Sequence, residues 1–155
     1  MNLYQYIGLL LSLTAGILSG IFIAKNCNEE LKEGAKYIKI LMVTLFYIVV
    51  FLTSKKIFNN TILLAIIPTL IIFLIFYLPI KIRNYSILLI LGACFSLIIK
   101  DPSDYVVILL MFIIFICIGS ITYYLERKNL VRSLAFKTLV FVIASAIIFF
   151  SYATR

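Results

Sequence analysis

The sequence contains no histidine, and this absence excludes much of the chemistry expected of an enzyme within a membrane. Histidine is the commonest general base near neutral pH and a frequent metal ligand. The chain therefore lacks the side chains for a serine and histidine dyad or for a membrane metalloprotease. It also lacks the GxGD motif of intramembrane aspartyl proteases. We predict no catalytic residue, no metal site and no cofactor.

Acidic residues and cysteines are also scarce. Asp and Glu number 6 against 14 Lys and Arg, for a formal net charge of +8. No charged residue lies in the middle of an apolar stretch, which disfavours ion-coupled transporters, proton pumps and voltage sensors, because these depend on charges inside the membrane. The three cysteines are an odd number without CxxC spacing, so they predict free thiols.

Apolar residues, in contrast, make up 65% of the chain, and a mean hydropathy of +1.19 lies far outside the range of soluble domains. Charged and turn-forming clusters divide the apolar residues into six stretches, each read as a helix. The first is not preceded by Lys or Arg, unlike a signal peptide. We predict an all-α fold, a polytopic transmembrane helical bundle of about six helices in one integral membrane domain over residues 1–155. The predicted spans are Leu3–Ala24, Ile38–Thr53, Thr61–Ile80, Tyr85–Ile99, Tyr105–Tyr124 and Leu134–Ser151.

The basic residues predict how these spans thread the membrane. The connections after the first, third and fifth spans hold ten Lys and Arg, including Lys137, whereas the other side holds four. Because Lys and Arg are enriched in cytoplasmic loops, we expect the odd-numbered connections in the cytoplasm and both termini outside the cell membrane. The basic residues are not interleaved with aromatic side chains, so membrane lipids are the expected partners and nucleic acid is not. Other membrane subunits or a second copy of the chain remain open as partners.

Tyrosines gather near the ends of the spans, where a ring with one polar edge is most stable. We therefore predict an interfacial belt, formed by Tyr4, Tyr6, Tyr37, Tyr77, Tyr85, Tyr105, Tyr123 and Tyr124.

Small residues recur every four positions along the first span. In lipid, small side chains allow helix backbones to approach closely, so such a row predicts a helix-packing seam. Its partner is either another helix of this chain, which we favour, or a different subunit. The seam comprises Gly8, Ser12, Gly16, Gly20 and Ala24, and a shorter copy occurs at Gly92 and Ser96.

The segment after the first span predicts a short surface helix. Asn28 suits its N-cap, Glu29 and Glu30 its first turn, and Gly34 its C-terminal cap. Glu29, Glu30 and Glu33, with Glu126 from a later connection, form a candidate polar cluster for a divalent cation or acid and base chemistry. We favour the alternative of a solvated turn in which Glu33 pairs with a nearby lysine.

The run EELKEGAKYI, following a first helix rich in Gly and Ser, resembles a pattern in small archaeal polytopic membrane proteins. The resemblance covers about 30 residues. It implies a multi-pass membrane protein and brings no assigned activity with it.

Three functions remain open at this point. The favoured one is a non-catalytic membrane subunit, scaffold or ligand-binding component. The first alternative is a lipid-modifying enzyme that uses Glu29, Glu30 and Glu126 at the cytoplasmic surface. The second is a permease for a small neutral solute, with a polar path past Thr69 and Ser96 near the helix-breaking Pro68.

Overall fold

The computed structural model describes residues 3–58, 61–78, 80–98 and 105–153, and these residues are helical apart from short connections at Cys27, Phe58 and Leu78, without a strand. The all-α prediction is therefore confirmed. Some of the turn-forming residues that mark the ends of the predicted apolar stretches, 101–104 and Pro79, lie outside the described residues. The elements are α1 (Leu3–Asn26), α2 (Asn28–Ile57), α3 (Thr61–Tyr77), α4 (Ile80–Ile98), α5 (Tyr105–Glu126), the 3₁₀ turn η1 (Arg127–Asn129) and α6 (Leu130–Ala153).

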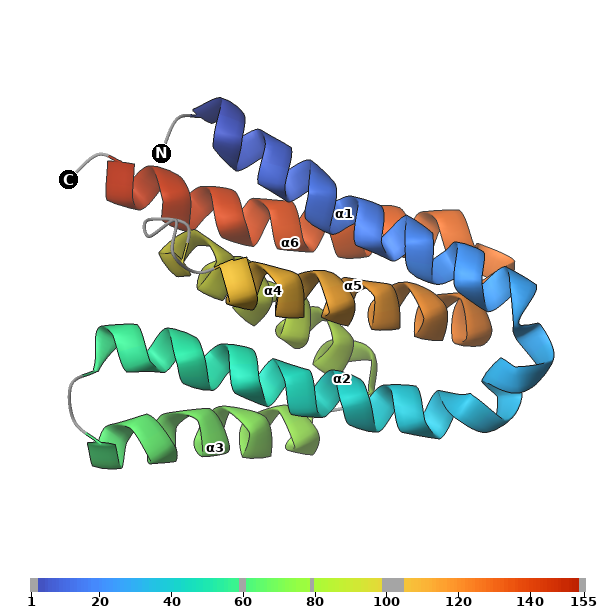
Figure 1. Cartoon of the computed structure of the whole chain (residues 1–155), viewed down its shortest axis with the longest axis horizontal. Helices are drawn as coiled ribbons and strands as arrows, with labels where there is room; N and C mark the ends of the chain where they lie inside the picture. The colour runs from blue at the N-terminus through green and yellow to red at the C-terminus, as the bar shows by residue number, and fades with distance from the viewer. Residues whose placement is uncertain (1–2, 59–60, 79, 99–104, 154–155) are drawn as a thin grey trace.

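The helices run alternately in opposite directions along the long axis of the molecule (Figure 1). The start of α1 and the end of α6 lie at one end, and the corners between α1 and α2 and between α5 and α6 lie at the other. A small apolar cluster of Ala24, Leu31 and Tyr123 joins these two corners. The two connections richest in basic residues therefore meet at the same end, which we call the basic end.

Among the described residues, three stretches are long and apolar enough to cross a membrane: Tyr4–Asn26, Glu29–Ile57 and Tyr105–Ser151. The third contains both α5 and α6, which η1 joins and which lie antiparallel in Figure 1. Ile66–Ile75 in α3 and Tyr85–Ile98 in α4 are shorter apolar helices. α3 continues through Pro68, which is buried.

The core forms where α5 packs against α1 and α2, and where α4 packs against α6. Its largest fully buried side chains include Phe95, Phe115 and Phe141, one from each of α4, α5 and α6. The Phe115 and Phe141 rings meet edge to face with centroids 4.7 Å apart. Such ring pairs add about 0.5–1.5 kcal/mol to the contribution of their buried area. α5 is thus the central helix of the bundle.

The prediction of a short surface helix after α1 was wrong. α2 is one continuous helix of 30 residues, and Gly34 lies within it without the positive φ of a C-terminal cap. Cys27, rather than Asn28, occupies the N-cap position and makes no capping side-chain hydrogen bond. Leu31 and Ala35 are buried at helical spacing, so packing keeps the helix unbroken through the glycine.

The small-residue seam of α1 packs over only part of its length, and its partner there is α5 of the same chain. Gly16, Gly20 and Ala24 are buried, whereas Gly8 and Ser12 are exposed. A Cβ on Gly16 would lie 3.1 Å from the carbonyl oxygen of Phe112, and one on Gly20 would overlap the backbone of Ile116. On the side of α5, a Cβ on Gly119 would overlap the backbone of Ile17 in α1 in the same way.

A second close approach joins α4 to α6 beside a group of buried hydroxyls. A Cβ on Gly92 would lie 2.8 Å from the carbonyl oxygen of Phe141. Nearby, the Ser96 hydroxyl donates to the carbonyl oxygen of Ser145 at 2.6 Å, and the Tyr6 hydroxyl donates to Ser145 Oγ at 2.8 Å. These bonds tie α1, α4 and α6 together, so Tyr6 is a core residue. It differs in this from exposed belt tyrosines such as Tyr4.

Removing one of these hydroxyls is expected to weaken the bundle modestly. Ser96→Ala loses an interhelical hydrogen bond, and such bonds within membranes contribute about 0.6 kcal/mol on average and up to about 1.7 kcal/mol. Thermal unfolding in detergent measures the loss. Ser12→Ala is the matched control, because the exposed Ser12 hydroxyl bonds only to Leu9 of its own helix and its loss should change nothing. Equal melting temperatures for the two variants would contradict this assignment.

Candidate functional site

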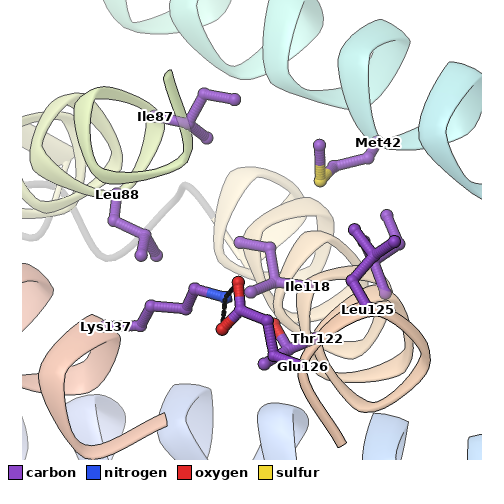
Figure 2. A pocket seen from close by; sticks show the side chains of 9 residues that line it. Met42, Ile87, Leu88, Ile118, Thr122, Leu125, Glu126 and Lys137 are labelled. Carbon is purple, nitrogen blue, oxygen red and sulfur yellow. Dashed lines mark hydrogen bonds and ion pairs between the residues drawn. The ribbon is translucent and has the colours of Figure 1, made fainter. Parts of the chain in front are cut away.

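A cleft opens between four helices near the basic end. It contains about 380 Å³ of space between protein atoms, counted out to its mouth, and a water centre fits in only about 30 Å³ of it. That inner space suffices for about two waters. Most of the wall is apolar, and Figure 2 shows the side chains converging from all sides. The lining residues are Met42 of α2, Ile87 and Leu88 of α4, Ile118, Ile121, Thr122, Leu125 and Glu126 of α5, and Lys137 of α6.

The polar side of the cleft centres on Lys137, which is only 3% exposed. Its ammonium donates to Thr122 Oγ1 at 2.9 Å, and to Glu126 Oε1 and Oε2 at 3.2 and 3.3 Å. A buried ammonium is costly unless charged and polar partners replace its water. Thr122 and Glu126 supply those partners from adjacent turns of α5, so the three residues form one unit.

Glu126 is the last residue of α5 and forms the outer part of this unit. Its side chain is 37% exposed, and it accepts a further hydrogen bond from Ser133 of α6. The C-terminal end of a helix carries partial negative charge, which disfavours a carboxylate there. The ammonium of Lys137 and the hydroxyl of Ser133 offset that effect. Glu126 therefore links the end of α5 to α6 through Lys137 and Ser133. It also borders the cleft.

The position of Lys137 corrects the sequence interpretation, which counted it among the basic residues of a connection. Lys137 is the eighth residue of α6, about 10 Å from its start at 1.5 Å per residue. The face that carries it continues four and eight residues later with Phe141 and Ser145, which are both fully buried. That spacing was a signal in the sequence that Lys137 lies on the inner face of α6.

The predicted polar cluster has its members on two separate elements. Glu29, Glu30 and Glu33 are exposed along the first turns of α2, whereas Glu126 pairs with Lys137. Within the described part of the chain, no group of three or more His, Cys, Asp or Glu side chains is placed to hold a metal ion. The two corners that carry these acids do adjoin, through Leu31 and Tyr123.

The two residues proposed to line a solute path lie in different surroundings. Ser96 is buried, and its hydroxyl is engaged by Ser145 and by the carbonyl oxygen of Gly92. Thr69 lies on the exposed surface of α3, next to the buried Pro68.

The polar groups that line the cleft largely satisfy one another. The carboxylate of Glu126 already accepts bonds from Lys137 and Ser133. An ammonium has three N–H groups, and Lys137 donates to three acceptor atoms, Thr122 Oγ1 and both carboxylate oxygens of Glu126. No bond among the described residues has the Thr122 hydroxyl as donor. The cleft therefore offers a ligand apolar walls and the Thr122 hydroxyl as a hydrogen-bond donor beside a neutral ion pair.

No family model, curated protein or solved structure matches this chain.

Proposed function

We propose that this chain is a multi-pass membrane protein, with six membrane-crossing helices, that binds a ligand between its helices and performs no covalent chemistry. The observation that carries the proposal is the cleft, in which a buried ammonium faces six apolar side chains. Pockets that combine apolar walls with a few convergent polar groups are typical binding sites. Among the non-catalytic roles, the cleft favours ligand binding over a purely structural scaffold.

The membrane setting of the proposal rests on the distribution of apolar and charged residues. The exposed surface of the helices is rich in large apolar side chains such as Leu18, Phe73 and Ile147, as expected of a surface that faces lipid. In the described residues, the exposed charges lie near the ends of the helices and within the first twelve residues of α2. With Lys137 removed from the count because it is buried, the odd-numbered connections still hold nine Lys and Arg against four. We therefore place the basic end in the cytoplasm and both termini outside the cell membrane.

Labelling from the two sides of the membrane tests this topology. In a Cys27→Ser background, Lys36→Cys and Arg127→Cys are expected to react with a membrane-impermeant maleimide in inside-out vesicles and not in whole cells. Lys55→Cys is expected to show the reverse, because Lys55 lies at the other end of α2. Cys94 and Cys117 are buried, so they should remain unlabelled and can stay in place. Labelling of positions 36 and 127 from opposite faces would rule out the topology.

The lipid-modifying enzyme remains an alternative with its own test. Its acids lie on two adjoining corners, and an enzyme built on them would lose turnover when Glu30 is replaced. A binding protein of the kind proposed here should tolerate Glu30→Gln without loss of ligand affinity, because the Glu30 side chain is exposed and is not part of the cleft.

A further inference from the structure

A row of lysines follows one side of α2 near the basic end. Lys32, Lys36 and Lys39 are all exposed, and at about 100° per residue they lie within about 60° of one another around the helix. We call these three residues the lysine face. Among the described residues, none of the three ammonium groups forms an ion pair or a hydrogen bond with another side chain. The face therefore presents three positive charges that the protein does not neutralise.

Packing at the corner fixes the direction of the lysine face. The buried Leu31 and the partly buried Ile38 pack into the apolar cluster that contains Tyr123 of α5. The middle of the lysine face lies about 110–130° around the helix from these two residues, so it points away from the contact with α5. α3 ends well short of the basic end, and the first turns of α2 extend beyond it (Figure 1).

The acidic side chains of the same segment lie to another side of α2. From the middle of the lysine face, Glu33 and Glu30 lie about 90° and 150° around the helix, and Glu29 lies at its edge, one turn before Lys32. The helix dipole favours negative charge in the first turn, which accounts for Glu29 and Glu30 there without a lysine partner. No carboxylate thus lies between the three lysines.

The length of α2 places the lysine face at the level of lipid headgroups. From Lys36 to Lys55, in the last turn of α2, is 19 residues, or about 29 Å at 1.5 Å per residue, which matches the roughly 30 Å of hydrocarbon in a bilayer. Lys32 lies about 6 Å beyond Lys36, within a headgroup layer that is roughly 5–8 Å thick. Lys39 lies about 5 Å on the apolar side of Lys36, and its long side chain extends back to the same level.

The exposed surface of α2 becomes apolar directly below the lysine face. Ile40 and Leu41 follow Lys39 and are exposed, and the exposed Tyr47 lies two turns further toward the centre of the membrane. Cations at the headgroup level above an apolar surface match both parts of an anionic phospholipid. An acidic protein segment would match the cations alone, so a lipid fits this side of α2 better.

We propose that the lysine face binds the headgroups of anionic phospholipids in the cytoplasmic leaflet. Phosphate oxygens accept hydrogen bonds from the three ammonium groups, and the acyl chains lie against the exposed apolar residues of α2 that follow. Each basic side chain near an anionic membrane surface raises affinity by about fivefold, so three aligned lysines favour anionic over neutral lipid strongly. The inference rests on the proposed topology, which places the basic end in the cytoplasm.

Native mass spectrometry of the full chain in a neutral detergent tests the proposal, with dioleoyl phosphatidylglycerol and dioleoyl phosphatidylcholine as probes. Phosphatidylglycerol is expected to bind at least tenfold more tightly than phosphatidylcholine. Lys32→Gln combined with Lys36→Gln should weaken the binding of phosphatidylglycerol at least tenfold. Lys128→Gln combined with Arg132→Gln, which removes the same charge from exposed positions at the same end, should leave it within about threefold.

A charge swap within α2 separates the lysine face from net charge. Glu33→Lys combined with Lys36→Glu leaves the composition and the net charge unchanged, but it puts a carboxylate in the middle of the face. Binding of phosphatidylglycerol should again weaken at least tenfold. All the substituted side chains are exposed, so each variant should fold and melt close to the temperature of the unmodified protein, which thermal unfolding checks.

Four results would overturn the proposal. Equal losses in the two double glutamine variants, or an unchanged affinity in the charge swap, would assign the binding to net charge. Equal affinities for the two lipids would assign it to apolar contact. Displacement of phosphatidylglycerol by poly-L-glutamate at equal charge would assign the face to an acidic protein partner. The assay in detergent does not depend on orientation, so its failure is distinguishable from a failure of the topology, which the maleimide labelling measures.

Discussion

Gly20→Val is expected to prevent the bundle from folding. Any Cβ at Gly20 would overlap the carbonyl group of Ile116 in α5, and a backbone group cannot rotate away as a flexible side chain can. Ser120 donates to the carbonyl oxygen of Gly20 at 2.9 Å in the same contact, so separating the helices would also break that bond. Overpacking of a well-packed core commonly costs about 1–3 kcal/mol, and a collision with backbone lies at or above the top of this range.

Size-exclusion chromatography and thermal unfolding of the purified protein measure this effect, and the chain offers two matched controls. Gly8→Val lies in the same helix, at an exposed position where a Cβ meets nothing within 4 Å, and should fold normally. Gly34→Ala also meets nothing and should raise stability by up to about 1 kcal/mol, because alanine favours a helix interior. If Gly20→Val unfolded at the same temperature as Gly8→Val, the packing of α1 against α5 described here would be wrong.

Glu126→Leu is expected to be the most damaging single change in the cleft. It leaves the ammonium of Lys137, which is 3% exposed, with Thr122 as its remaining partner. Removing one member of a buried ion pair costs about 3–5 kcal/mol, and the partial exposure of Glu126 lowers the expected loss to about 2–3 kcal/mol. Lys137→Met should cost less, because the half-exposed carboxylate that remains can turn toward water.

A double-mutant cycle isolates the interaction between the two charges. Glu126→Leu combined with Lys137→Met replaces both with apolar side chains of similar size and should recover most of the stability lost in Glu126→Leu alone. Thermal or denaturant unfolding in one detergent provides all four free energies. Additive losses in the double variant would mean that the two side chains do not interact in the folded protein.

Local sequence patterns predicted an all-helical chain because each apolar stretch ends at charged or turn-forming residues. The predicted span Tyr105–Tyr124 corresponds to α5, which continues for only two more residues, to Glu126. The prediction was wrong at α2, where Gly34 suggested a helix end. The glycine costs a continuous helix only about 1 kcal/mol, and the burial of Leu31 and Ala35 on one face outweighs it.

The candidate site was less predictable than the helices. From the sequence, Glu126 was predicted to form a cluster with the acidic residues of α2. The order of acidic residues along the chain does not reveal which side chains they contact. Lys137 was assigned to a connection because it lies close to Arg132 and to the start of an apolar run. Its partners Thr122 and Glu126 lie 15 and 11 residues earlier in the chain, on the preceding helix. Only the turn between α5 and α6 brings the three together.

By itself, the sequence determined that this chain forms apolar helices with charges at their ends, because backbone hydrogen bonding and hydropathy act over short distances along the chain. It also determined which side chains are small enough for close helix contacts. Only the tertiary structure decided that Gly16 and Gly20 meet α5 while Gly8 stays exposed, and that Lys137 turns inward to Glu126. Those outcomes depend on which helices become neighbours, and packing between residues far apart in the chain determines this.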